Sequence, residues 1–351
     1  MALIFFTGFD TYATADITKE FTTVTGFSTS VPGIYETGGR RGGGALRAPN
    51  NESFGSSALI TLPSSVTTFV CGFAFYANIF YTDKTFALFK DSGTKQLELQ
   101  MNSDGTIDVT RNGTVLGTSS ASMSTFTYHY IEFKATINNS TGSYELRLDG
   151  VNILSASGVD TQNTANASIN SVTLGSPSEN MGGVGYFDVD WRYDDFYVLD
   201  TTGSAPNNNF LGDVRIDSVY PTGDGNYTQY SLSTGSSHYQ LVDEATPNTT
   251  DYVYNGTDGN KDSFAMGNVA ALTAQTIYGV RVKAAALKDD AGTRTLKVGV
   301  RSGSTDSVSS AQALTTSQLY VSHILETDPN TSAAWTESGV NALESLIETA
   351  S

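Results

Sequence analysis

Apolar and polar residues alternate with a period of two through most of the first half of the chain. This pattern predicts strands, because successive side chains of a strand point to opposite faces of a sheet. The predicted strands are residues 57–62, 68–76, 85–90, 96–101, 107–111, 114–119, 128–137, 142–148, 151–155, 170–174 and 191–199. Turn residues such as Asn112-Gly113 and Asp149-Gly150 separate several of them, which indicates a meander of hairpins.

The alternation stops at residues 201–209, a run of small and polar residues with nothing to bury. We therefore predict two domains: residues 1–203, and residues 217–351 after a linker and first strand at 204–216. Further strands are predicted at 212–220, 250–254, 261–265, 277–287, 293–302 and 317–327.

Two segments of the second half have a helical pattern, which is weak in one and clear in the other. The weak one covers residues 236–243. The clear one covers residues 336–348, where Val340, Leu343, Leu346 and Ile347 fall on one helical face behind a possible Thr336 cap. We predict a short C-terminal helix that docks on the second sandwich.

Composition supports an all-β protein and narrows its partners. The 351 residues include 34 Gly, 18 Tyr and 18 Phe, and the formal net charge is −17. Such a charge repels phosphate backbones and anionic lipids, so we expect neither nucleic acid nor membrane insertion. The single Cys71 forms no internal disulfide. Residues 1–10 resemble a first strand rather than a signal peptide.

Several short motifs in the first half resemble the laminin-G-like, concanavalin A-like jelly roll. They are residues 6–10 (FTGFD), 39–47 (GRRGGGALR), 130–134 (YIEFK), 142–154 (GSYELRLDGVNIL) and 194–200 (DDFYVLD). This resemblance implies a jelly-roll β-sandwich over residues 1–203, followed by a second β-sandwich.

The second half is similar to sequences that follow such jelly rolls in bacteriophage structural proteins. The matching stretches are residues 207–215 (NNNFLGDVR), 288–294 (KDDAGTR), 300–303 (VRSG) and 327–337 (TDPNTSAAWTE). The resemblance implies a structural virion component, such as a tail fibre, spike or capsid decoration, assembled in the host cytoplasm. It also implies other virion proteins and copies of itself as partners, with a homotrimer formed through the second domain.

If the protein is a virion component, we expect it to contact a glycan on the host surface. The alternatives are a carbohydrate-binding adhesin outside a virion and a glycan-degrading enzyme. Since glycosidases of this fold use a pair of carboxylates, we searched for the motif Glu-x-Asp-x-x-Glu and found none. Glu132 and Glu145 fall on different predicted strands and are expected at the surface.

The histidines also gave no sign of catalysis. His129, His238 and His323 lie far apart in the sequence, without metal-ligand spacing and without a Gly-x-Ser-x-Gly elbow. We therefore predict that the protein is not an enzyme.

Residues 187–195 (FDVDWRYDD) carry the strongest candidate site. Carboxylate oxygens suit Ca²⁺, and the first and last strands of a jelly roll are usually neighbours. Candidate metal ligands are therefore Asp10, Asp188, Asp190, Asp194 and Asp195. Hydrogen bonding of these carboxylates in turns is the alternative. Tyr186, Trp191 and Tyr193 are candidates for stacking on sugar rings, with core packing as the competing interpretation.

Overall fold

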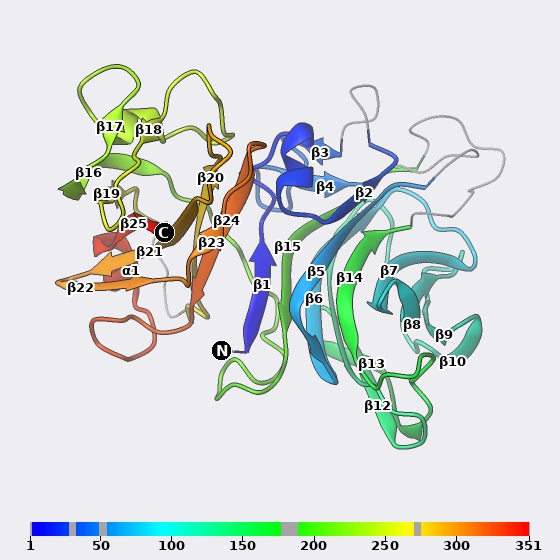
Figure 1. Cartoon of the computed structure of the whole chain (residues 1–351). Coiled ribbons are helices and arrows are strands. Elements are labelled where there is room, and N and C mark those ends of the chain that lie inside the picture. The colour runs from blue at the N-terminus through cyan, green and yellow to red at the C-terminus, as the bar shows by residue number, and fades with distance from the viewer. Residues whose placement is uncertain (1, 28–32, 49–54, 177–188, 270–274, 351) are drawn as a thin grey trace. The chain divides into compact units, whose positions relative to one another are not determined.

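A computed structural model describes residues 2–27, 33–48, 55–176, 189–269 and 275–350 (Figure 1). The regular secondary structure of the described chain is almost all antiparallel sheet, which confirms the predicted all-β class. It divides into two compact units, Ala2–Ile216 and Asp217–Ser351 with Met1. Among these residues, no helix is long and apolar enough to cross a membrane.

The first unit is a sandwich of two sheets. The eight-stranded sheet has the order β13 (Val151–Val159), β12 (Gly142–Leu148), β11 (Tyr128–Thr136), β6 (Thr68–Ala77), β15 (Trp191–Leu199), β4 (Ala45–Arg47) and β3 (Ile34–Tyr35), and β1 (Leu3–Thr7) also pairs with β15. The first and last strands are thus neighbours, as the jelly-roll resemblance implies.

The facing seven-stranded sheet has the order β10 (Thr114–Thr118), β9 (Ile107–Arg111), β8 (Thr94–Met101), β7 (Lys84–Asp91), β14 (Ile169–Gly175), β5 (Ser57–Val66) and β2 (Thr23–Thr25). One 3-10 helix, η1 (Thr14–Lys19), lies between β1 and β2. The alternation in the sequence predicted six of these seven strands, because burial of one face fixes the register. It missed β2, and it ended β5 four residues early, at residue 62.

Aromatic side chains from both sheets fill the core between them. The rings of Phe75 and Phe86 lie 4.9 Å apart, and those of Phe69 and Phe89 lie 4.8 Å apart. Each pair joins a strand of one sheet to a strand of the other, so the two sheets are held by direct ring contacts.

The outer face of the eight-stranded sheet is crossed by residues 209–216, which we call the strap. Glu132 on β11 is buried, and its Oε1 accepts the Tyr197 hydroxyl at 2.5 Å and the Gly212 amide at 2.9 Å. The predicted surface position of Glu132 is therefore wrong, because the strap covers it. The ring of Tyr197 also requires Gly72, since a Cβ there would lie 2.2 Å from the ring.

The second unit is built on a six-stranded sheet. Its order is β16 (Pro221–Thr228), β19 (Lys261–Met266), β25 (Glu344–Ala350), β21 (Thr295–Ser302) and β22 (Thr305–Val308), with β23 (Gln312–Ala313) also paired to β21. Two short ladders join β17 (Ser231–Leu232) to β18 (Val253–Tyr254) and β20 (Val280–Ala286) to β24 (Leu319–Leu325). The 3-10 helix η2 (Tyr239–Leu241) falls in the weak helical segment.

Three expectations for the second unit differ from the structure. Residues 212–220 form no strand; the amides of Gly212 and Ile216 donate instead to the carboxylates of Glu132 and Asp195 on the eight-stranded sheet. The C-terminal helix α1 covers only Glu337–Ala342, although Thr336 caps it by accepting the Gly339 amide. Leu346 and Ile347 belong to β25, which pairs with β19 and β21 at the centre of the sheet. Tertiary pairing therefore overrides the helical periodicity there.

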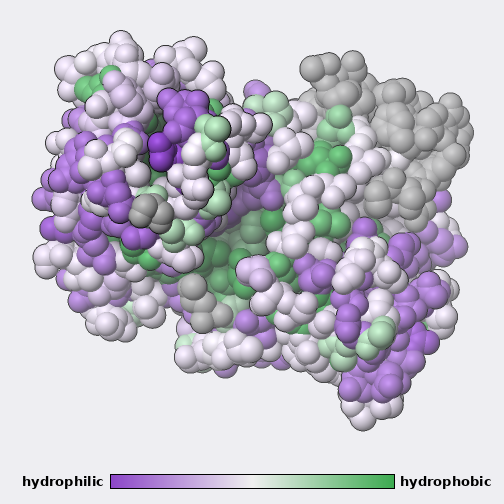
Figure 2. Space-filling model, in the orientation of Figure 1, coloured by the Kyte–Doolittle hydropathy of each residue, from purple (hydrophilic) through white to green (hydrophobic). Residues whose placement is uncertain are grey.

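Figure 2 shows hydrophilic side chains gathered on the first unit where β12 and β13 lie in Figure 1. This agrees with the mixed exposed and half-buried pattern of β13.

Candidate functional site

The predicted calcium site is a cluster of ion pairs and hydrogen bonds in the structure. Asp188 lies outside the described residues. The Arg40 amide donates to Asp194 Oδ2 at 2.7 Å, and the Arg40 guanidinium donates to Asp195 Oδ2 at 2.7 and 3.1 Å. Asp195 Oδ1 accepts the Ile216 amide at 2.7 Å. Asp10 accepts the Gly44 amide at 2.9 Å.

Asp190 stands apart from this cluster and pairs with two other arginines. Arg47 donates to its Oδ1 at 2.8 Å, and Arg192 donates to its Oδ2 at 3.0 Å. Guanidinium groups thus occupy the positions that a cation would need.

Burial also disfavours charge on these carboxylates. It raises the pKa of Asp194 to about 8, with the nearby Asp195 carboxylate adding to the effect. The pKa of Asp195 is raised as well, chiefly by burial, against the lowering effect of Arg40. Within the described ranges no group of three or more His, Cys, Asp or Glu side chains could hold a metal ion. The donor set does not fit Ca²⁺.

The predicted sugar-stacking rings are core residues. Trp191 and Tyr193 are both 0% exposed. Trp191 Nε1 donates to the Ile79 carbonyl at 3.2 Å, and the Tyr193 hydroxyl donates to the Phe86 carbonyl at 2.8 Å. Neither ring has a free face for a ligand, so core packing holds for both. Tyr186 lies outside the described residues.

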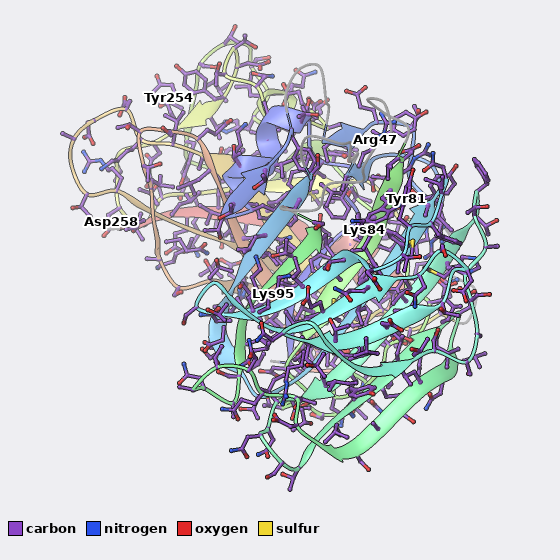
Figure 3. The ribbon with its side chains drawn as sticks, turned by 90° about the vertical axis from the view of Figure 1, so that its right-hand side faces the viewer. Arg47, Tyr81, Lys84, Lys95, Tyr254 and Asp258 are labelled. Atoms are coloured by element: carbon purple, nitrogen blue, oxygen red, sulfur yellow. The ribbon has the colours of Figure 1, made fainter. Side chains whose placement is uncertain are left out.

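A different set of side chains gathers on the outer face of the seven-stranded sheet, which Figure 3 turns toward the viewer. Strand pairing places Thr110, Glu98, Leu88 and Thr173 in one row across β9, β8, β7 and β14. Asp108, Gln100 and Thr85 form a second row, and Lys95, Lys90 and Ser171 a third. We call the polar members of these rows the polar face.

Glu98 is the centre of the contacts on the polar face. Its Oε2 accepts the Thr85 hydroxyl at 3.0 Å and the Lys95 ammonium at 2.8 Å, although Glu98 is only 2% exposed. Gln100 donates to the Thr85 oxygen at 3.4 Å. Lys95 and Lys84 lie near opposite ends of the β7–β8 pair (Figure 3).

The charges of the polar face interact with one another. The pKa of Lys90 is lowered, chiefly by burial and then by the neighbouring Lys95 ammonium, against the raising effect of Glu98. The face therefore offers ammonium donors, a carboxylate and an amide within one continuous stretch of sheet.

Three oxygens of the polar face are buried without a hydrogen-bond partner in the described structure: Asp108 Oδ1, Thr110 Oγ1 and Thr173 Oγ1. Their residues are 6%, 0% and 1% exposed. Buried polar groups are normally paired, and leaving one unpaired costs about 1–3 kcal/mol.

None of these residues belongs to a sequence motif that predicts a site. Their signal was present, because polar side chains occupy the alternate positions of strands whose other positions are apolar. However, the same pattern is typical of any sheet with one solvated face. Only strand order places Asp108, Thr110 and Thr173, from two parts of the chain, on one surface.

Comparisons with known proteins give a likeness of fold. No family model matches the chain, and no curated protein does so. The solved structures it is similar to include alginate lyase Aly36B, at 16% identity and a TM-score of 0.38, with 55% of this chain and 95% of that chain covered. The alginate lyase vAL-1 from Chlorella virus is similar at 8% identity and a TM-score of 0.36, with 51% and 88% covered.

A sialidase is similar at 10% identity and a TM-score of 0.35, with 45% of this chain covered, and the chain spans only 15% of that protein. The prediction that this protein is not an enzyme is withdrawn, because its main ground does not hold. The missing carboxylate motif excludes one kind of glycosidase only, and not catalysis in general.

Proposed function

We propose that the first unit binds a polysaccharide along the polar face of its seven-stranded sheet. The observation that carries the proposal is the partly exposed group of donors and acceptors on β8 and β7, where the Lys95 ammonium contacts Glu98 and the Gln100 amide contacts Thr85. Sugar hydroxyls both donate and accept hydrogen bonds, so they suit the ammonium, amide and carboxylate groups of this face together.

The arrangement suits an extended ligand. The rows cross four neighbouring strands, from β9 to β14. Because strands lie about 4.8 Å apart, the three spacings between these four strands add up to roughly 14 Å. A chain of several sugar residues is long enough to span them. The two lysines and two carboxylates of the face nearly balance in charge, so hydroxyl groups are expected to contribute most of the recognition.

The proposal is tested by measuring binding of the full chain to a panel of neutral and uronic-acid polysaccharides by affinity electrophoresis. Lys95→Ala and Gln100→Ala are expected to weaken binding at least about tenfold, since each removes a ligand contact of roughly 1.5 kcal/mol. Thr114→Val, an exposed position on β10, is the matched control and should bind as the wild type.

Equal binding by all three variants, or no binding to any member of the panel, would overturn the proposal. The same incubations, followed by chromatography for oligosaccharide release, report whether binding is accompanied by cleavage of the polysaccharide.

The place of the protein in a bacteriophage particle, with other virion proteins and a homotrimer of its own chain, remains a prediction that rests on the sequence resemblance. Mass spectrometry of purified particles tests it, because a virion component copurifies at a fixed stoichiometry. Light scattering of the full chain tests the trimer.

A further inference from the structure

Ser124, His129 and Asp149 lie in hydrogen-bond contact near the start of β11, within the first unit and on chain segments that the polar face does not use. Ser124 Oγ lies 2.9 Å from His129 Nε2, and His129 Nδ1 lies 2.8 Å from Asp149 Oδ2. A hydroxyl, an imidazole and a carboxylate thus follow one another in a single line of contacts.

The protonation of the imidazole follows from a third contact. His129 Nε2 also lies 3.0 Å from the Ser124 backbone nitrogen, which donates to it. A backbone N–H is only a donor, so Nε2 must be the unprotonated nitrogen of the neutral ring. Nδ1 therefore carries the hydrogen and donates it to Asp149. In this tautomer the basic nitrogen faces the serine hydroxyl.

The fold holds the carboxylate firmly. Asp149 lies in the turn between β12 and β13 with a φ of 51°. Its Oδ1 accepts the Tyr130 amide at 2.8 Å, and its own amide donates to the Tyr130 carbonyl at 2.8 Å. Tyr130 itself is buried. Two hydrogen bonds to a core strand therefore orient Asp149 toward the imidazole.

We propose that Ser124 is the nucleophile of an esterase site, with His129 as general base and Asp149 as a positioning residue. The substrate class is an ester of a short-chain acid with an alcohol, including a sugar hydroxyl. Ser124 is exposed, and the side chain of Phe126, two residues away, is 70% exposed, so an acyl group has an apolar ring close to the nucleophile.

The reaction needs only the ester and water. Ser124 Oγ bonds to the carbonyl carbon while its proton passes to His129 Nε2, and the carbonyl π electrons move onto oxygen. The tetrahedral intermediate then expels the alcohol, which takes the proton from Nε2. Water attacks the acyl-serine by the same steps, which releases the carboxylic acid and restores the serine hydroxyl.

A donor for the oxyanion is available next to the nucleophile. The backbone amide of Thr125, the residue after Ser124, donates to no acceptor within the described structure. In hydrolases with a serine nucleophile, the amide of the residue after the serine commonly serves this purpose.

Labelling of the full chain with a fluorophosphonate probe tests the nucleophile directly. We expect a single covalent adduct at Ser124, mapped by mass spectrometry of the digested protein. Ser124→Ala should lose it, whereas Ser122→Ala, an exposed serine in the same loop, should be labelled as the wild type. A folded wild-type chain that takes up no label, or a Ser124→Ala variant that is labelled equally, would overturn the proposal.

Hydrolysis of p-nitrophenyl acetate tests the base and the positioning residue. His129→Gln should lower kcat by about 100-fold or more. Asp149→Asn should lower kcat with KM nearly unchanged, since it disturbs the tautomer rather than the binding of the ester. Circular dichroism confirms that each variant is folded. Hydrolysis that is unchanged in both folded variants would contradict the assignment, whatever the outcome of the polysaccharide binding experiment.

Discussion

The two outer faces of the first unit treat their buried polar groups in opposite ways. On the eight-stranded sheet, the strap supplies donors to Glu132, Tyr197 and Asp195. On the seven-stranded sheet, Asp108, Thr110 and Thr173 each keep an oxygen without a described partner. The strap supplies partners on the first face, whereas no described residue pairs with these three oxygens on the second. The difference teaches that two equally buried sheet faces can differ in how far the chain itself satisfies their polar groups.

The two faces differ in degree, because one oxygen beneath the strap also has no described partner. Glu132 Oε1 accepts two hydrogen bonds while its Oε2 has no described partner. The carboxylate is nevertheless anchored at both the core and the strap.

The largest effect should come from breaking the strap's central anchor. Glu132→Ala leaves the Tyr197 hydroxyl and the Gly212 amide without their acceptor. Since each unsatisfied buried donor costs about 1–3 kcal/mol, we expect the free energy of unfolding to fall by about 4 kcal/mol. Urea denaturation should follow Trp191 fluorescence in a Trp335→Phe background, so that only the first unit reports. Glu145→Ala, a half-exposed position beside Arg147, is the control and should change it by less than about 1 kcal/mol. Equal losses would show that the strap is not anchored through Glu132.

The second effect is a dependence of the unfolding free energy on pH, caused by the buried carboxyl of Asp194. The folded pKa of Asp194 is raised to about 8, so the folded unit holds a proton that the unfolded chain releases above its ordinary pKa near 4. The contribution of this group to stability is complete below about pH 4, falls as the pH rises, and is lost above about pH 8.

Asp194→Asn should therefore flatten the dependence of the unfolding free energy on pH between 5 and 8, by on the order of 3 kcal/mol over that range. Urea denaturation at several pH values measures it, with Asp83→Asn at an exposed loop position as the control. A slope that is unchanged in Asp194→Asn would show that Asp194 is already ionised in the folded protein at these pH values.

The third effect is the change in unfolding free energy on replacing a buried threonine by valine, compared between a hydroxyl that has hydrogen-bond partners and one that has none. Thr161 is 0% exposed, and its hydroxyl donates to the Thr136 carbonyl at 2.7 Å and accepts the Asn138 amide at 2.9 Å. Thr161→Val should cost about 1–2 kcal/mol. Thr110→Val, at an unpartnered hydroxyl, should be neutral or stabilise by up to about 1 kcal/mol. If both cost the same, the polar face is completed within the chain and the comparison of the two faces fails.

The smallest effect concerns calcium. Because Arg40 occupies the carboxylates of Asp194 and Asp195, we expect no change in the melting temperature between chelator and millimolar Ca²⁺. A ligand that binds only the folded state raises it by mass action, so a rise of several degrees would reinstate the metal site.

The sequence by itself determined the strands of the first unit. Period-2 alternation fixes β9, β12 and β15 at their observed bounds, because burial of one face leaves one register. It also determined the all-β class, whereas the pairing of the first strand with the last was expected only from the jelly-roll resemblance. It did not determine the C-terminus, where residues 336–348 have helical periodicity but pairing with β19 and β21 draws Glu344–Ala350 into the sheet.

Only the tertiary structure decided the sites. Trp191 and the aspartates of β15 are residue types typical of a ligand site. In the structure, however, Trp191 is packed in the core and Arg40 pairs with Asp195. The polar face and the contact of Ser124 with His129 and Asp149 join residues from separate strands or turns, so no local pattern marks them. The physical reason is that alternation encodes which face of a strand is buried, whereas a site depends on which strands are neighbours and on what the chain leaves unpaired.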